Sequence, residues 1–304
     1  MHILISGGTG MIGTALTGSL LADGHQVWVL TRNPAKAQLP EGVTALGWNG
    51  RNTLGWGEMV SQVDAVINLV GESLSRWPWT SSRKQRFLDS RVQGGRALAL
   101  AVQASSPRPK VLIQASGVNY YGPHGLEPVT EADPPGKDFL AGLCQDWEAS
   151  TKPVEELGVR RVIIRSGVVF SAREGILPIM LLPVRLFAGG PLGSGRQGLA
   201  WIHLADEVAA IRFLLENPAA SGPYNLTAPD PVSNAEFNRT AARLLRRPYW
   251  LPAPAWALRL VLGGMATLVL DGLYLRPQRL QELGFPFRFG GLEAALRDLL
   301  SEKG

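Results

Sequence analysis

The chain has 304 residues, 45% of them hydrophobic and 18% charged, a composition that excludes disordered, collagen-like and coiled-coil proteins. Lys and Arg (30) outnumber Asp and Glu (25), which gives a net charge of +5 without any basic tract. This balance favours an anionic small ligand and gives no indication of nucleic-acid binding. The single cysteine, Cys144, can form neither an internal disulfide nor a cysteine-based metal site, so we expect a cytoplasmic protein without a metal centre.

The first residues and one later apolar stretch bear on membranes. An apolar run follows Met1 directly, and we therefore expect no secretion signal. Residues 260–270 are the most membrane-like stretch, but they amount to about half of the roughly 20 residues that span a bilayer. We predict a buried helix at this stretch and no membrane partner.

Short apolar runs and helical patterns alternate over the first 170 residues. The apolar runs are at residues 2–6, 26–30, 65–70, 111–114 and 162–169. Helical patterns follow the first run and recur at residues 83–102 and 145–157. Alternation of continuous apolar strands with helices predicts an α/β protein, a doubly wound parallel-sheet Rossmann fold with helices on both faces.

The character of the sequence changes after residue 170. Residues 174–198 are rich in Gly and Pro, and residues 229–254 are punctuated by Pro. Between them, a helix at 206–217 and a strand at 224–227 are expected to return to the sheet, and the capping-box spacing at 233–236 opens a helix to about Leu245. We predict a dinucleotide-binding domain over 1–170, with 205–228 returning to it, and a small substrate lobe over 171–204 and 229–304.

Residues 8–13 (GTGMIG) match the pattern G-x-G-x-x-G between the first strand and the first helix. Glycine is needed because a tight turn brings backbone N–H groups and the helix N-terminus against a pyrophosphate, where a Cβ would intrude. The alternative is a glycine-rich turn that binds no nucleotide. The expected cofactor contacts of this turn are Gly7, Gly10, Met11, Ile12 and Gly13.

The end of the second strand discriminates between NAD and NADP because it lies beside the adenosine ribose. Thr31 and Arg32 occupy this end, and no acidic residue is present there to bind a free 2′-hydroxyl. Arg32 therefore favours NADP(H), since a guanidinium binds a 2′-phosphate by charge-assisted hydrogen bonds. A solvated surface arginine is the alternative.

Two further segments are expected at the cofactor. The fourth strand runs into a loop of small and apolar residues, in which Leu69, Val70 and Gly71 are the expected contacts. A basic helix follows, and we expect Arg86 and Arg91 to face the cofactor while its other arginines form a solvated face.

Together these residues resemble the extended short-chain dehydrogenase/reductases, the group of sugar-nucleotide epimerases and dehydratases. The resemblance rests on residues 7–13, 116–122 (SGVNYYG) and 201–203 (WIH) with Asp206. The chain is more closely similar to an atypical, epimerase-like branch through residues 165–169 (RSGVV), 190–195 (GPLGSG), 234–237 (NAEF) and the C-terminal segment 252–299. The match implies that Arg91 lies beside the cofactor ribose and that Val169 approaches the nicotinamide.

The chain departs from the family at the catalytic pair. Extended members carry Tyr-x-x-x-Lys in the helix after the fifth strand, where the tyrosine transfers a proton and the lysine lowers its pKa. Alignment on Glu148 places Leu140 at the tyrosine and Cys144 at the lysine, and neither can do that work. Gly117 replaces the assisting hydroxyl, with Ser116 one residue earlier.

Replacement chemistry has several candidates. Tyr120 and Tyr121 follow the fifth strand, where either phenol is placed to transfer a proton or to pack against substrate. Ser116 is expected to contact the substrate or the carboxamide, or else to bond to backbone. The expected substrate residues are Glu72, Arg196, Trp201 and His203, with a surface arginine and a strand-anchoring histidine as the alternatives. We interpret Cys144 as a buried structural thiol because its neighbours are acidic.

The sequence thus predicts strand order 3-2-1-4-5-6 with a seventh strand, and a substrate lobe over the carboxyl ends of the strands. The first functional hypothesis is an NADP(H)-dependent oxidoreductase or epimerase-like enzyme for a small, polar or anionic substrate. The second is a regulatory module that binds NADP(H) as a sensor and does no chemistry. A scaffold that binds no nucleotide is a third, and both the substrate and the oligomeric state stay open.

Overall fold

A computed structural model describes residues 1–301, and its centre is a parallel sheet. Seven strands form this sheet within the described residues, in the order β10-β6-β5-β4-β1-β2-β3. Their bounds are β1 His2–Ser6, β2 Gln26–Thr31, β3 Thr44–Gly47, β4 Ala65–Asn68, β5 Val111–Gly117, β6 Arg160–Ser166 and β10 Gly222–Leu226. Every neighbouring pair is parallel. The predicted fold class and strand order are confirmed.

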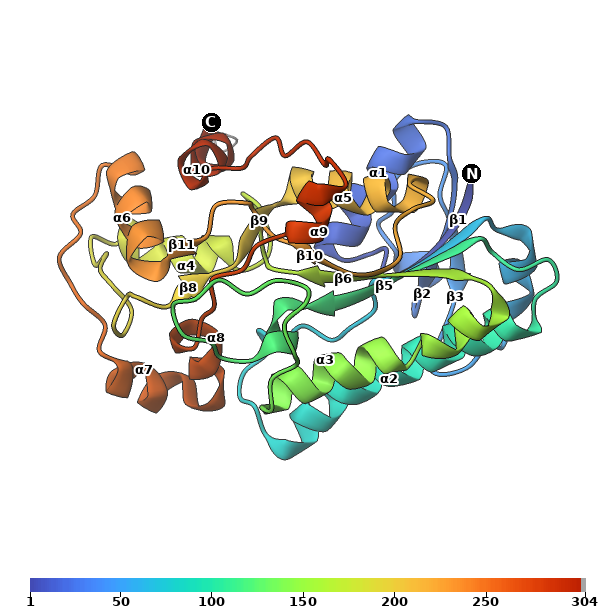
Figure 1. The fold of residues 1–304 in the computed structure, drawn as a ribbon, viewed down its shortest axis with the longest axis horizontal. Helices are drawn as coiled ribbons and strands as arrows, with labels where there is room; N and C mark the ends of the chain where they lie inside the picture. The colour runs from blue at the N-terminus through green and yellow to red at the C-terminus, as the bar shows by residue number, and fades with distance from the viewer. Residues whose placement is uncertain (302–304) are drawn as a thin grey trace.

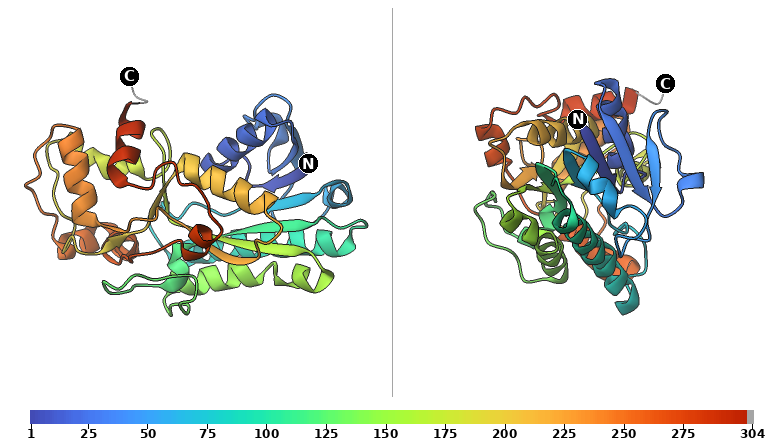
Figure 2. Two further views of the ribbon diagram at one scale, coloured as in Figure 1. Left: turned by 45° about the horizontal axis from the view of Figure 1, so that its top comes forward. Right: turned by 90° about the vertical axis from the view of Figure 1, so that its right-hand side faces the viewer.

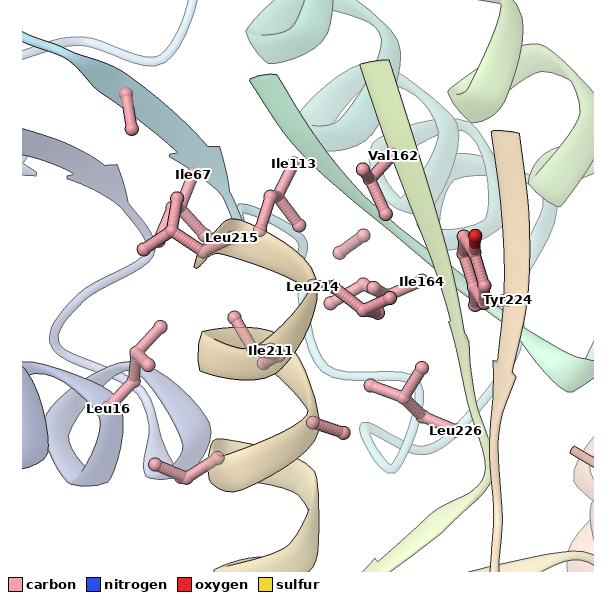
Figure 3. Packing of buried hydrophobic residues seen from close by; sticks show 14 of the residues in the cluster. Leu16, Ile67, Ile113, Val162, Ile164, Ile211, Leu214, Leu215, Tyr224 and Leu226 are labelled. Atoms are coloured by element: carbon pink, nitrogen blue, oxygen red, sulfur yellow. The ribbon is translucent and has the colours of Figure 1, made fainter. Parts of the chain in front are cut away.

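Helices cover both faces of the sheet (Figure 1). One face carries α1 (Met11–Ala22) and α5 (Leu204–Glu216), and the other carries α2 (Ser81–Ala104) and α3 (Phe139–Ala149). Side chains of α1 and α5, such as Leu16 and Ile211, pack on Ile67, Ile113 and other strand residues (Figure 3). Short 3₁₀ helices join these elements: η1 (Pro34–Lys36), η2 (Gly57–Gln62), η3 (Val118–Tyr121) and η4 (Lys152–Leu157).

Two predicted elements have different bounds in the structure. The helix predicted at 145–157 begins instead at Phe139, because the carboxylate of Asp138 accepts hydrogen bonds from the backbone N–H groups of Leu140 (2.7 Å) and Ala141 (3.2 Å). It ends at Ala149, before η4. The apolar run at 162–169 is two strands, since the chain leaves the main sheet after Ser166 and continues as β7 (Val168–Phe170), paired with β9 (Trp201–His203).

Most of the remaining elements gather at the end of the molecule that carries α6, α7 and α10 (Figures 1 and 2). They are α4 (Leu177–Arg185), β8 (Gly198–Leu199), β11 (Val232–Ser233), α6 (Asn234–Leu244), α7 (Ala255–Leu262), η5 (Gly263–Ala266), α8 (Thr267–Leu270) and α10 (Leu292–Ser301). The short helix α9 (Gln278–Glu282) lies instead beside β10, where its Leu280 joins the core of the main sheet. Trp201, Phe237 and Leu296 meet in a separate hydrophobic core here. The predicted cap of α6 is confirmed, because Ser233 Oγ accepts a hydrogen bond from the N–H of Glu236 at 3.1 Å.

The prediction of a buried helix at 260–270 is wrong. This stretch is the end of α7, then η5 and α8, and of the described residues in it only Ala266 is buried. Gly263 and Gly264 break the apolar run into pieces too short to be covered on all sides. Within residues 1–301, no helix has the length and apolar character required to cross a membrane.

Candidate functional site

The turn between β1 and α1 is built on backbone contacts that only glycine permits. Gly7 has φ +76°, and a Cβ on it would lie 2.7 Å from the carbonyl oxygen of Leu69. A Cβ on Gly13 would lie 2.6 Å from Gly8 Cα. The turn therefore presses against the loop after β4, and α1 begins directly beside the carboxyl ends of β1 and β4.

The N-terminus of α1 is open toward this edge of the sheet. Gly10 is the N-cap residue and offers no side chain to the helix. The N–H of Thr14 donates to the carbonyl of Gly10 at 2.8 Å, which leaves the preceding N–H groups, those of Met11, Ile12 and Gly13, outside the helical ladder. Free N–H groups and the positive end of the helix dipole make this point suitable for a pyrophosphate.

A cleft of about 820 Å³ opens in front of the turn. It is lined by nine of the residues expected at the cofactor or the substrate: Gly7, Gly10, Thr31, Arg32, Leu69, Val70, Gly71, Glu72 and Arg86. All of its lining residues lie between Gly7 and Gln93. The turn, the ends of β2 and β4, and the start of α2 thus converge on one cavity large enough for a nucleotide.

Several lining residues were missed by the sequence analysis, notably Trp48, Asn49, Arg51 and Arg76. Asn49 Oδ1 accepts hydrogen bonds from the N–H groups of Arg51 (2.8 Å) and Asn52 (3.2 Å), which folds the segment after β3 into a turn. The carboxyl ends of β2 and β3 are neighbours, so Arg51 joins Arg32 on the same cavity. The polar turn at 49–52 after a third strand was the available signal.

Glu72 is surrounded by arginines at the mouth of the cleft. Its carboxylate lies 3.5 Å from Arg83, 3.7 Å from Arg76 and 3.9 Å from Arg86. One carboxylate against three guanidinium groups leaves a local positive charge. An anionic group is therefore favoured in this part of the cleft.

Arg91 is buried behind the cleft wall. Its Nη1 donates to the carbonyl oxygens of Glu72 (3.0 Å) and Phe87 (3.1 Å), and its guanidinium lies 4.8 Å from the Trp147 ring centroid. Burial lowers the pKa of Arg91 to about 10. This placement does not fit the expected contact of its side chain with the cofactor ribose; instead, Arg91 holds the loop that carries Gly71.

A buried polar network lies at the carboxyl ends of β5, β6 and β10. Ser116 Oγ donates to Glu148 Oε1 at 2.7 Å, and Arg165 binds both oxygens of Glu148 at 2.9 and 3.0 Å. Arg165 Nη1 also donates to the Tyr121 hydroxyl at 2.9 Å, and that hydroxyl donates to Asn225 Oδ1 at 2.7 Å. The network joins β5, α3, β6, η3 and β10, so it fixes the carboxyl ends of three strands.

The titration of these groups follows from burial. Desolvation raises the pKa of Tyr121 to about 12 despite the nearby Arg165. Desolvation, followed by the charge of Glu148, raises the pKa of the Cys144 thiol to about 12. Burial alone would lower the pKa of Arg165, but its hydrogen bonds to Glu148 outweigh burial and raise it. Arg165 is therefore held in its charged form beside Glu148, whereas Tyr121 and Cys144 are held in their neutral forms.

Tyr120 differs from its neighbour. Its ring is half-buried, and Arg165 Cζ lies 3.4 Å from the ring centroid. The rings of the two adjacent tyrosines meet edge to face with centroids 5.3 Å apart, but Tyr121 is fully buried, while Tyr120 is partly exposed. We therefore revise the expectation that either tyrosine can transfer a proton to a substrate. The Tyr121 hydroxyl is fully buried and takes part in two hydrogen bonds, so it cannot contact a substrate in this conformation.

The expected substrate residues of the lobe lie apart from the nucleotide cleft. Trp201 is buried and stacks on Phe170 with ring centroids 5.4 Å apart. The buried ring of His203 stacks on Phe289, and its Nδ1 accepts from the N–H of Ala205 at 3.0 Å. These placements revise the expectation that either faces a substrate, because both pack the lobe core. Arg196 is exposed on its loop.

Val169 and Met11 both lie beside Gly175, in the segment after β7. A Cβ on Gly175 would lie 3.1 Å from the Met11 sulfur and 3.7 Å from the Val169 carbonyl oxygen. Gly175 therefore lies between β7 and the first residue of α1. This brings Val169 close to the helix N-terminus that would hold the pyrophosphate.

Comparison with known proteins places this geometry in a family. Residues 3–227 match the NAD dependent epimerase/dehydratase family, and residues 253–299 match the family described as Domain of unknown function (DUF1731). The chain belongs to the NAD dependent epimerase/dehydratase family. Its suspected resemblance to the epimerase-like group is thereby confirmed.

Relatives match over the full length. The chain is 38% identical to the epimerase family protein YfhF of Bacillus subtilis over 304 residues, which cover 100% of this chain and 99% of the relative. It is 39% identical to the epimerase family protein SAB0724c of Staphylococcus aureus over 301 residues, 98% and 99% of the two chains.

Solved structures agree with the family. The structure of the human epimerase family protein SDR39U1 (isoform 2) with NADPH has a TM-score of 0.88 and 33% identity, and the match covers 99% of both chains. A nucleoside-diphosphate sugar epimerase from Corynebacterium glutamicum has a TM-score of 0.81 and 31% identity over 99% of this chain and 58% of that one.

Proposed function

We propose that the chain is an NADP(H)-dependent oxidoreductase or epimerase-like enzyme that acts on a small, polar or anionic substrate. The observation that carries this proposal is the cleft itself, in which the glycine turn, the N-cap residue of α1 and four arginines line one cavity. When bound, NADP(H) would supply or accept a hydride. The glycine turn would hold its pyrophosphate, and the ends of β2 and β3 would hold its adenosine.

The choice of NADP(H) over NAD(H) is supported by charge at the ends of β2 and β3. Arg32 and Arg51 both line the cleft there. A guanidinium binds a phosphate through two parallel hydrogen bonds, whereas a ribose hydroxyl is bound best by a carboxylate. The presence of NADPH in the structure of human SDR39U1 also supports this choice.

For proton transfer we propose Tyr120. Its ring is half-buried and lies on the Arg165 guanidinium, which Glu148 holds in place by two hydrogen bonds. The guanidinium packs against the ring and fixes its orientation, so the buried pair would position Tyr120 for proton transfer. Ser116 and Tyr121 would position this pair, and the lobe over 171–204 and 229–304 would bind the substrate.

The cofactor assignment is tested by calorimetric titration with NADPH and NADH. Arg32→Ala is expected to weaken NADPH binding about 10- to 100-fold, because it removes a charge-assisted bond of roughly 1.5–3 kcal/mol, and to change NADH binding by less than about threefold. Arg108→Ala, an exposed arginine just before the amino end of β5, is the matched control. Equal affinity of the native chain for the two cofactors, or an unchanged NADPH affinity in Arg32→Ala, would refute the assignment.

Catalysis is tested by following NADPH oxidation against carbonyl and enone compounds. With a turned-over compound, Tyr120→Phe is expected to lower kcat about 10²- to 10⁴-fold, the usual contribution of a general acid. Tyr121→Phe is expected to lower the unfolding midpoint and to leave kcat within about tenfold of the native value. An unchanged kcat in Tyr120→Phe would remove that residue from the mechanism.

A second function, an NADP(H)-binding sensor without chemistry, is favoured by one observation. Leu140 and Cys144 are both buried at the positions of the usual tyrosine and lysine. A chain that has lost its catalytic pair but kept its cofactor cleft would respond to the NADPH/NADP⁺ ratio. Tight NADPH binding without turnover against any tested compound class would favour this second function.

A further inference from the structure

The lobe presents large apolar side chains to solvent on one surface. Trp250, Trp256, Leu260 and Val261 are 65%, 70%, 80% and 68% exposed, and Leu186 and Phe187 are exposed beside them. We refer to these six residues as the lobe patch. Trp250 Nε1 donates to the Phe187 carbonyl at 2.9 Å, which joins residues 248–251 to the end of α4, and α7 begins four residues after Leu251. Exposure on this scale marks an interaction surface.

Charge is distributed unevenly around the lobe patch. Residues 175–205 and 237–270 contain seven arginines and no Asp, Glu or Lys. They carry +7, whereas the whole chain carries +5, so the rest of the molecule is slightly acidic. Arg243 is paired with Glu293 at 2.7 Å, whereas Arg246, Arg247 and Arg259 are exposed beside residues of the lobe patch.

The arginines lie among the apolar side chains. Arg246 and Arg247 are exposed just before Trp250, and Arg247 Cζ lies 4.3 Å from the Phe187 ring centroid. Arg259 is exposed on α7 between Trp256 and Leu260. The surface thus presents indole and aliphatic groups interleaved with cations.

We propose that the lobe patch docks on an anionic lipid bilayer. Trp, Leu and Arg in this mixture are the composition of helices that lie in a membrane interface, where apolar groups enter the acyl boundary and guanidinium groups bind lipid phosphates. With eight residues, α7 is too short to span and is suited to lying in the interface plane. The proposal differs from the expectation of no membrane partner in that it predicts a peripheral contact.

Charge also argues against the other occupants. A second copy of the chain would bring the exposed Arg246, Arg247 and Arg259 of both copies face to face. A nucleic acid would neutralise the arginines, but its phosphates would leave Leu260 and Val261 exposed to water. A bilayer with anionic headgroups satisfies both the charge and the apolar area.

The test is co-sedimentation of the full chain with two kinds of vesicle. One consists of phosphatidylcholine alone, and in the other about 30% of the lipid is phosphatidylglycerol, whose negative charge gives the surface a negative potential like that of a cytoplasmic leaflet. Binding is expected to the anionic vesicles alone and to weaken as salt rises. Two double variants are tested separately: Trp256→Ser/Leu260→Ser and Arg246→Gln/Arg247→Gln. Each is expected to weaken binding to the anionic vesicles at least about 10-fold.

The matched control is Arg96→Gln/Leu100→Ser, which changes an exposed arginine and leucine one turn apart on α2. It is expected to bind like the native chain. Only variants whose unfolding midpoint matches that of the native chain are compared. Leu260→Ser alone is used if the double variant fails to fold. No binding to anionic vesicles, binding that the patch variants leave unchanged, or a dimer in sedimentation velocity that they dissociate would overturn the proposal.

Discussion

Glu207, in the first turn of α5, is a buried acid. Its Oε1 accepts a hydrogen bond from the uncharged hydroxyl of Ser166 at 2.5 Å. Burial raises the pKa of Glu207 to about 8. The unfolded chain releases this proton near its ordinary pKa of about 4.3, so the folded state binds more protons between the two values. Stability must therefore fall as the pH rises from about 4.3 toward 8.

Glu207→Gln is expected to remove this dependence, because the amide does not titrate. The measurement is the free energy of unfolding in urea at pH 5.5, 6.5 and 7.5, roughly across the window in which one proton contributes up to about 1.4 kcal/mol per pH unit. Glu216→Gln, an exposed carboxylate on the same helix, is the control and should keep the native slope. Identical slopes in the native chain and Glu207→Gln would show that Glu207 is ionised in the folded state.

At the residue scale, sequence reasoning found chemical types but not their partners. Tyr120 and Tyr121 are equivalent in a local pattern, and only the turn of η3 and the arrival of Arg165 from β6 distinguish a surface ring from a buried phenol. Glycine is the exception. The requirements on Gly7 and Gly13 are local and backbone-based, so the spacing in the sequence was sufficient to predict their place.

At the scale of the element, the glycine turn yields a matched pair of variants. Gly13→Ala would push a Cβ against the backbone of Gly7 and Gly8. We expect at least about 10-fold weaker NADPH binding and a loss of roughly 1–3 kcal/mol in the free energy of unfolding, because a displaced turn no longer presents the N-terminus of α1. Calorimetry and thermal unfolding measure the two effects.

The control is Gly18→Ala, which lies on the same helix with nothing within 4 Å of its new Cβ. Alanine there should raise stability by about 0.5–1 kcal/mol through helix propensity and leave NADPH affinity unchanged. If both variants behave alike, the close contacts at Gly13 do not control the site.

Element boundaries were less predictable than element types. The start of α3 depends on the Asp138 cap, which lies seven residues before the segment 145–157 in which the sequence predicted a helix. The division of β6 from β7 depends on β9 pairing with the second piece, an interaction across more than thirty residues. Periodicity reports which residues are apolar, and it does not report where a cap or a new strand partner ends an element.

At the scale of the whole molecule, the strand order followed from alternation, since right-handed crossovers permit few arrangements. The exposed α7 did not follow, because hydrophobicity alone predicts burial and cannot supply the covering element. The lobe core also needed the structure: it joins Trp201, Phe237 and Leu296 from three distant segments. Trp201 and His203 are large and partly polar, which made them candidate substrate residues in the sequence. In the structure, their rings pack in the lobe interior instead.

The lobe core and the cofactor cleft should be energetically separable. Leu296 of α10 is fully buried in the lobe core, whereas every residue that lines the cleft lies between Gly7 and Gln93. Leu296→Ala is expected to lower the free energy of unfolding by about 2–5 kcal/mol, the cost of a cavity, without changing NADPH affinity.

Leu98→Ala removes an equally buried leucine from α2, the helix that carries Arg86, Ser90 and Gln93 into the cleft. It should cost similar stability and weaken NADPH binding as well, because the cavity lies under the cleft wall. Urea unfolding and calorimetry of the two variants compare these effects directly, and an equal loss of NADPH affinity in both would mean that the lobe helps to shape the cofactor cleft.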